Sequence, residues 1–198
     1  KAAQTLGKPV RVIYNGWDSW DASNEEWPAP SDYWLFVGRT DDAMKGARYF
    51  KEIFKLGMKL PARWVAVPGS GLEDVPGLTI TGKQTSAQVR QWLTKARGII
   101  VPSLYEGFSL IVLEALASGV PIVTTTVGGN LALPKDLKGI TFIPPRDSQA
   151  LAKAVANLDQ DYAPETLAAR KDRAQWNRSR LQTWKQVTQS MLNFAQQL

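Results

Sequence analysis

Residues 101–125, VPSLYEGFSLIVLEALASGVPIVTT, contain a short apolar strand, a turn with proline and glycine, an apolar helix and a second apolar strand. Short strands that are apolar at every position are typical of parallel sheets, because helices cover both faces of such a sheet. We therefore predict that this segment is a strand–helix–strand unit of an α/β protein.

The same alternation of strand and helix extends over most of the chain. Strands are expected at 10–14, 33–38, 63–67, 78–81, 98–101, 120–125 and 140–143, and helices at 43–57, 85–96 and 148–158, with one more beginning at 107–110. This pattern predicts a Rossmann-like parallel sheet flanked by helices over residues 1–160.

Residues 161–198 are expected to form a helical tail. Apolar residues recur there at helical spacing, which predicts an amphipathic helix packed on this domain: Leu181, Trp184, Val187, Met191 and Phe194. Near the other end of the chain, Trp17 and Trp20 are expected to pack in the core rather than at a hinge between domains.

The ends of the predicted strands carry the polar and glycine residues that a ligand site needs. In an open parallel sheet the ligand crevice lies beyond the carboxyl ends of the strands. Gly38-Arg39, Gly69–Gly71, Gly82-Lys83 and residues 102–107 all follow such ends. We therefore expect these four segments to converge on one rim of the sheet.

Two carboxylates, Glu106 and Glu114, lie in or just before the apolar helix. A buried carboxylate needs a partner, so either another part of the protein or a ligand satisfies Glu114. If both residues were helical, they would lie about 12 Å apart along the axis and about 80° apart around it. A retaining glycosidase needs its two carboxyl groups about 5 Å apart. This spacing indicates two acids that hold opposite ends of an elongated ligand.

Composition limits the chemistry of the chain. With 198 residues, 44% apolar and 21% charged, the sequence is that of an ordinary globular domain. It contains no cysteine and no histidine, so catalysis must use carboxylates, Lys and Arg side chains, backbone amides or groups from outside this sequence. The absence of these residues also argues against thiolate metal sites, and we predict no metal.

The net charge of +6 indicates an anionic partner such as a diphosphate or an acidic lipid surface. Nucleic acid is not expected, because the Lys and Arg residues are dispersed and no recognition motif is present. The sequence shows neither a signal-peptide pattern nor a membrane-spanning run. We therefore expect a cytoplasmic protein, and a peripheral membrane contact through the basic surface is compatible with this expectation.

Several short motifs occur in the order found in one enzyme family. In chain order they are Asn15–Asp18, Phe36–Arg39, Lys45–Gly46, Pro102–Ser103, Glu106–Leu110, Glu114–Pro121 and Gly128–Gly129. Glu106 and Glu114 form the Glu-x7-Glu element of that family. Over about residues 10–160, the chain resembles the donor-binding domain of retaining GT-B glycosyltransferases of the "group 1", or family-four, type.

The opening of the motif helix has the chemistry of an anion site. Unpaired backbone N–H groups and the helix dipole at residues 107–110 favour a phosphate there. Gly107 allows the backbone to approach a ligand closely. The resemblance implies the same donor-binding role for this whole turn, which consists of Gly107, Phe108, Ser109 and Leu110.

The resemblance assigns roles to the charged residues as well. Arg39 and Lys45 would clamp the diphosphate of a nucleotide sugar. Glu114 would accept hydrogen bonds from the ribose hydroxyls. Glu106, the expected catalytic residue, would contact the hydroxyls of the donor sugar or the charge that develops at its anomeric carbon. These roles describe transfer of a glycosyl group with retention, and no metal or other cofactor is expected.

Two positions depart from the family pattern. Five residues separate Arg39 from Lys45, where the family usually has four. Ala132 stands where the family often has a glutamate after Gly128-Gly129. These departures bear on the role of Lys45 and on the contacts with the donor sugar.

The resemblance makes this chain the C-terminal half of a hexosyltransferase for polysaccharide or glycoconjugate synthesis. An N-terminal domain would hold the acceptor, which is a glycan, a lipid or a small molecule, and the tail at 161–198 would pack on this domain or on that N-terminal domain. The chain by itself is then predicted to bind donor with little or no turnover. Two alternatives remain open: a sugar-nucleotide epimerase of GT-B fold, and a non-catalytic module that binds nucleotide sugars. The absence of histidine disfavours the epimerase, whereas donor affinity without transfer would support the module.

Overall fold

The computed structural model describes residues 10–17, 27–68, 71–162 and 165–197. A six-stranded sheet with strand order β3-β2-β1-β4-β5-β6 forms its centre, and every neighbouring pair is parallel. The strands are β1 (Tyr33–Gly38), β2 (Arg63–Pro68), β3 (Leu78–Ile80), β4 (Gly98–Val101), β5 (Ile122–Thr125) and β6 (Ile140–Ile143). The predicted α/β class and parallel sheet are confirmed.

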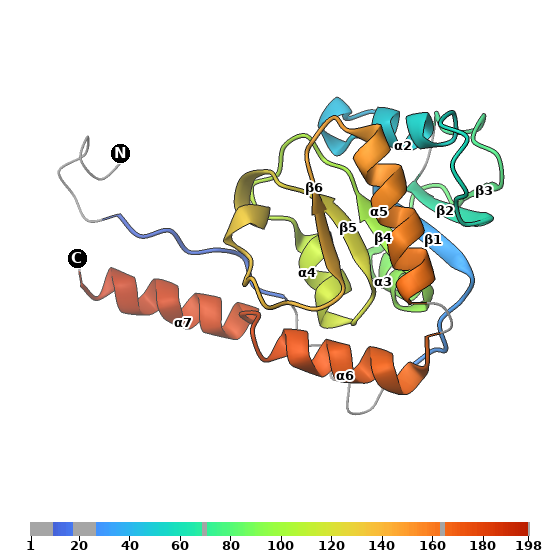
Figure 1. Ribbon diagram of the computed structural model, residues 1–198. Coiled ribbons are helices and arrows are strands. Elements are labelled where there is room, and N and C mark those ends of the chain that lie inside the picture. The colour runs from blue at the N-terminus through green and yellow to red at the C-terminus, as the bar shows by residue number, and fades with distance from the viewer. Residues whose placement is uncertain (1–9, 18–26, 69–70, 163–164, 198) are drawn as a thin grey trace.

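Helices cover both faces of this sheet (Figure 1). The regular helices are α2 (Ala47–Ile53), α3 (Ser86–Lys95), α4 (Leu110–Ala117), α5 (Ser148–Asp161), α6 (Leu167–Arg178) and α7 (Trp184–Ala195). Two short 3-10 turns, η1 (Ala43–Lys45) and η2 (Gly128–Ala132), complete the described elements. One apolar cluster joins the sheet to α2 and α5, and a second joins it to α3 and α4.

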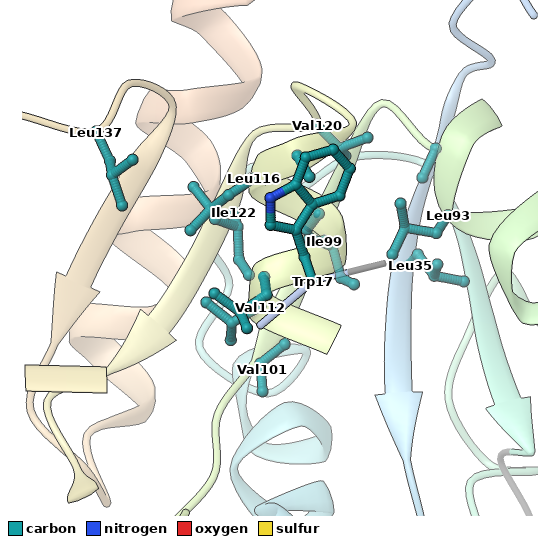
Figure 2. Close-up of a cluster of buried hydrophobic side chains, with 14 of the residues drawn as sticks. Trp17, Leu35, Leu93, Ile99, Val101, Val112, Leu116, Val120, Ile122 and Leu137 are labelled. Carbon is teal, nitrogen blue, oxygen red and sulfur yellow. The ribbon is translucent and has the colours of Figure 1, made fainter. Parts of the chain in front are cut away.

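Trp17 belongs to the second cluster, although it precedes the first strand. Figure 2 shows its ring surrounded by buried aliphatic side chains from strands and helices, among them Leu35, Leu93, Ile99, Val112, Leu116 and Ile122. The predicted core position of Trp17 is therefore confirmed, whereas Trp20 lies outside the described residues.

The prediction of a strand at 10–14 is wrong. These residues have no regular secondary structure, and Val12 is 69% exposed. Tyr14 packs on the Phe108 ring, and the isolated bridge that follows this segment joins Trp17 to Thr183, in the connection before α7, and not to an edge of the sheet. An apolar β-branched run becomes a strand only where a neighbouring strand is available, and sequence propensity does not supply that neighbour.

The helix predicted at 43–57 is shorter and divided in two. Gly46 separates η1 from α2 in the left-handed region, with φ of 74°. A Cβ at this position would lie 1.9 Å from the carbonyl oxygen of Pro102. The break therefore allows the loop after β4 to pack closely on residues 43–46, where the Leu104 N–H donates to the Met44 carbonyl at 2.7 Å.

The tail consists of α6 and α7, and α6 packs against α4. A buried ion cluster fixes the start of α6: Glu165 accepts hydrogen bonds from Arg170, at 2.9 Å, and from Arg173. Burial lowers the pKa of Arg170 below its ordinary value, although Glu165 opposes this shift.

Figure 1 shows α7 extending away from the sheet. In the apolar stripe of α7, Val187 is buried and Met191 is exposed. Contact between this stripe and an N-terminal domain stays a prediction.

Among the described residues, none of the helices has the length and apolar character required to cross a bilayer.

Candidate functional site

An open cavity of about 560 Å³ lies at the carboxyl ends of β1, β2 and β4. The strand order reverses direction between β1 and β4, and this is the point where open α/β sheets bind ligands. The lining combines aliphatic side chains at the strand ends with cations and one carboxylate. The lining residues are Asn15, Val37, Gly38, Arg39, Lys45, Val67, Lys83, Gln84, Val89, Val101, Glu106, Phe108, Ser109, Leu110 and Ile111.

The predicted convergence on one rim is confirmed for three of the four strand-end segments. Gly38 and Arg39 line the cavity, together with Lys83 and Glu106. Gly69 and the residue after it lie outside the described residues. The cavity therefore gathers cations from two separate loops beside the carboxylate at position 106.

Most of the predicted site residues line this cavity. They are Arg39, Lys45, Glu106, Phe108, Ser109 and Leu110. Gly107 and Glu114 are not among the lining residues. A Cβ at Gly107 would meet no described atom within 4 Å, so packing inside the chain does not require glycine there. Glu114 is half-buried in α4, one turn beyond Leu110. The functional roles of all these residues stay predictions.

Glu106 is buried and belongs to a network that crosses from one loop to another. Its Oε1 accepts a hydrogen bond from the Ser103 hydroxyl at 2.7 Å and one from the Lys45 ammonium at 2.9 Å. The Ser103 carbonyl in turn accepts from the Thr125 hydroxyl at 2.5 Å. Hydrogen bonds to an ionised partner are stronger than neutral ones, so this network fixes the carboxylate at the cavity wall.

Two glycines after β5 hold the loop that carries Glu106. Gly128 has φ of 49°, and a Cβ there would lie 1.6 Å from the Glu106 carbonyl oxygen. The Gly129 N–H donates to the Gly107 carbonyl at 2.8 Å. The loop can approach so closely because neither residue has a side chain. The Gly-Gly pair identified in the sequence therefore has a structural role in supporting the Glu106 loop.

The longer spacing between Arg39 and Lys45 does not keep Lys45 out of the cavity. The intervening residues form a turn in which the Asp42 carboxylate accepts a hydrogen bond from the Met44 N–H and pairs with Arg39 at 2.9 Å. The hydrogen bond from the Met44 N–H, and to a smaller extent the contact with Arg39, lower the pKa of Asp42 below its ordinary value. Both cations thus border the same space as Glu106.

The first turn of α4 faces the cavity through Ser109, Leu110 and Ile111. Ser109 is the N-cap residue, but within the described chain its hydroxyl makes no capping hydrogen bond to this turn. The positive end of the helix dipole therefore points at a space already bordered by cations. This end of the cavity is suited to an anion.

Sequence reasoning did not include several residues that border the cavity. Asn15 lines it and donates through Nδ2 to the Phe108 carbonyl at 3.2 Å, while the Tyr14 ring lies 5.1 Å from that of Phe108. Gln84 also lines the cavity, and its Nε2 donates a hydrogen bond to the Thr81 carbonyl at 2.9 Å. The sequence held a signal for each of these two lining residues: Asn15 belongs to a turn that resembles the family motif, and Gln84 closely follows the end of a predicted strand.

Among the described residues, no group of three or more carboxylates is arranged to hold a metal ion.

An open parallel sheet with a cationic cavity at its switch point defines an α/β domain that binds a small anionic ligand. Residues 31–161 match the family model described as "Glycosyl transferases group 1". Because this match covers well over half of the chain, the protein belongs to that family. The resemblance inferred from its motifs is confirmed, and the domain is of the kind that forms the C-terminal half of GT-B glycosyltransferases.

Comparison with known proteins gives the same class. The chain is 25% identical over 178 residues to an uncharacterized glycosyltransferase of Methanocaldococcus jannaschii, covering 77% of this chain and 45% of the relative. It is 27% identical over 177 residues to glycogen synthase of Mycobacterium tuberculosis, covering 81% and 42%. The chain thus spans less than half the length of these curated relatives.

Solved structures show the same fold at lower identity. Sucrose-phosphate synthase from Thermosynechococcus elongatus superposes with a TM-score of 0.69 at 23% identity, over 94% of this chain and 52% of that one. A glycosyltransferase from Rickettsia africae gives a TM-score of 0.73 at 16% identity, over 93% and 56%. The Rossmann-like architecture is therefore shared with about half of each of these proteins.

Proposed function

We propose that this domain binds the nucleoside diphosphate sugar donor of a retaining glycosyltransferase, whose acceptor is held by an N-terminal domain. One observation carries the proposal: Arg39, Lys45, Glu106 and the first turn of α4 border one cavity at the switch point of the sheet. The aliphatic part of the lining suits the nucleoside, and the cationic part suits the diphosphate.

In the proposed reaction, the bond between the anomeric carbon and the β-phosphate oxygen breaks. A bond forms between that carbon and an acceptor hydroxyl, on the same face of the sugar, and the hydroxyl proton passes to the departing diphosphate oxygen. Negative charge develops on the departing diphosphate, where Arg39, Lys45 and the amides opening α4 stabilise it. In this proposal these groups supply the stabilisation, so the reaction requires no metal ion or other cofactor.

Glu106 is the proposed catalytic carboxylate. Its ion pair with Lys45, the cation that would bind the diphosphate, supports this role, because Glu106 would then lie near the bond that breaks. It would accept hydrogen bonds from the donor sugar or stabilise positive charge at the anomeric carbon. Glu114 lies outside the cavity lining, so its proposed contact with the ribose requires a donor that extends beyond the cavity beside α4.

The test is a binding panel of UDP, GDP, ADP, their sugars and NAD, measured by thermal stabilisation and calorimetry. Ligand linkage predicts that one nucleoside diphosphate stabilises the protein by about 2.7 kcal/mol at a hundredfold excess over its Kd. Substitution of Arg39 by alanine should weaken this ligand, because a cation at the diphosphate is lost. If neither UDP, GDP, ADP nor their sugars bind, the proposal is wrong.

The same panel separates transfer from binding alone. A protein that includes the N-terminal domain should transfer sugar from the donor that the panel identifies, and the stereochemistry of its product can be read by NMR. An inverted anomeric centre would contradict the retaining mechanism. Donor affinity without transfer would leave a binding module as the function.

A further inference from the structure

Three side chains of α6 donate hydrogen bonds to the C-terminal end of α4. Asn177 Nδ2 donates to the Leu116 carbonyl at 3.0 Å, and Arg178 Nε donates to the Ala117 carbonyl at 2.7 Å. Arg173 Nε donates to the carbonyl of Gly119, two residues beyond the helix, at 2.7 Å. The carbonyl end of α4 is thus capped by a different helix.

The capping residues differ in charge. Asn177 is neutral and fully buried, and its amide also joins α4 to the connection before β6 by exchanging two hydrogen bonds with the Lys138 backbone. Arg173 is buried beside Glu165, which it shares with Arg170, so this cluster of three charges retains one net positive charge. The Arg178 guanidinium lies 5.3 Å from the Trp17 ring centroid. Two guanidinium groups therefore stand at the same pole of α4.

These cations matter because α4 is short. Its eight residues, LIVLEALA, include one carboxylate, Glu114, and no basic side chain, and they span about 12 Å. A helix carries roughly half a positive charge at its N-terminus and half a negative charge at its C-terminus. An anion at the first turn is attracted by the near pole and repelled by a far pole only about 12 Å away. Cations placed at the far pole remove that repulsion.

We propose that Arg173 and Arg178 are positioning residues of the donor site, which act on the diphosphate through α4. They neutralise the negative pole of this helix, so that its positive pole, bordered by Arg39 and Lys45, attracts the diphosphate without repulsion from the far pole. This inference rests on the proposed donor function of the cavity. It gives α6 a role in ligand affinity in addition to its role in packing.

The test replaces Arg178 by glutamine, which keeps a hydrogen-bond donor but removes the charge. The matched control is Arg180→Gln, which removes the same charge two residues later, beyond the end of α6, where Arg180 contacts Asp136 and the Trp176 ring and not the carbonyl groups that end α4. The probes are the nucleoside diphosphate that the wild-type protein binds and its uncharged nucleoside. Affinities are measured by calorimetry or NMR at low salt, well below the melting temperature of each variant.

Arg178→Gln should weaken binding of the diphosphate about two- to fivefold, through the loss of a charge more than about 12 Å away, and leave binding of the nucleoside unchanged. Arg178→Lys should restore most of the affinity, and Arg180→Gln should change neither ligand. If glutamine prevents folding, Arg178→Met keeps the stem packed near Trp17 and removes the same charge. An equal loss for both ligands, or no loss, would overturn the inference and leave a purely structural cap. If the wild-type protein binds none of UDP, GDP and ADP, the proposed function itself fails and the inference falls with it.

Discussion

The ion pair between Lys45 and Glu106 is the contact through which the cavity wall can be perturbed most directly. Lys45 belongs to the turn after β1, and Glu106 follows β4, 61 residues later. Only 31% of the lysine side chain and 10% of the glutamate side chain are exposed. The perturbation is a double-mutant cycle with Lys45→Met, Glu106→Gln and both together.

The expected size of the coupling follows from this partial burial. Exposed ion pairs contribute about 0.2–1 kcal/mol, whereas loss of one partner from a fully buried pair costs about 3–5 kcal/mol. Among the described side chains, Lys45→Met leaves the Glu106 carboxylate with the Ser103 hydroxyl as its partner. We expect this variant to lose about 2 kcal/mol of unfolding free energy, with a coupling of about 1–2 kcal/mol between the two sites.

The assay is urea unfolding at pH 7, followed by tryptophan fluorescence and circular dichroism. The control cycle uses Arg48 and Glu52, an exposed pair one turn apart on α2, for which we expect about 0.3–0.5 kcal/mol. A Lys45–Glu106 coupling no larger than that of the control pair would refute the conclusion that this contact is desolvated. It would also remove the main reason for placing Glu106 in a fixed position.

Three further predictions concern the supports of the site and the stability of the fold. Gly128→Ala should lower the unfolding free energy by more than about 2 kcal/mol, because the new Cβ adds a clash with the neighbouring loop to the strain of a left-handed backbone. The control Gly57→Ala, at a residue with similar φ but open space, should lower it by only about 1 kcal/mol. Equal losses in urea unfolding would contradict the packing argument. Glu165→Gln should lower the unfolding free energy by about 3 kcal/mol, because two buried guanidinium groups lose their counter-ion. A melting temperature within about 2 °C of the wild type would show that this cluster is not desolvated. Hydrogen bonds, chiefly the one from Arg48, lower the pKa of Glu52 in the folded protein. The stability that Glu52 contributes is therefore present above its unfolded-state pKa of about 4.3 and is lost as the pH falls through its folded-state pKa. Glu52→Gln should make the unfolding free energy fall less steeply on the acid side, and an unchanged slope below about pH 4.5 would contradict this prediction.

The sheet could be predicted from the sequence because its strands are short and apolar at most positions. The runs that became β1, β2 and β4 are buried on both faces, which is a property of each run by itself. The segment 10–14 has a similar composition but lacks a neighbouring strand, so the same reasoning failed there. The helix boundary near Gly46 was missed because the close approach of Pro102 requires the break, and that contact is remote in sequence.

The sequence by itself determined the α/β class, the family and the set of chemical groups at the strand ends, because periodicity and short motifs are local properties of the chain. Tertiary structure decided which of these groups meet. Strand order places β1 beside β4, and this juxtaposition brings Lys45 to Glu106 and leaves Glu114 outside the cavity lining. It also places α6 against the far end of α4, where Asn177 and Arg178 cap the site helix. Such contacts depend on how elements pack in space, which no single segment specifies.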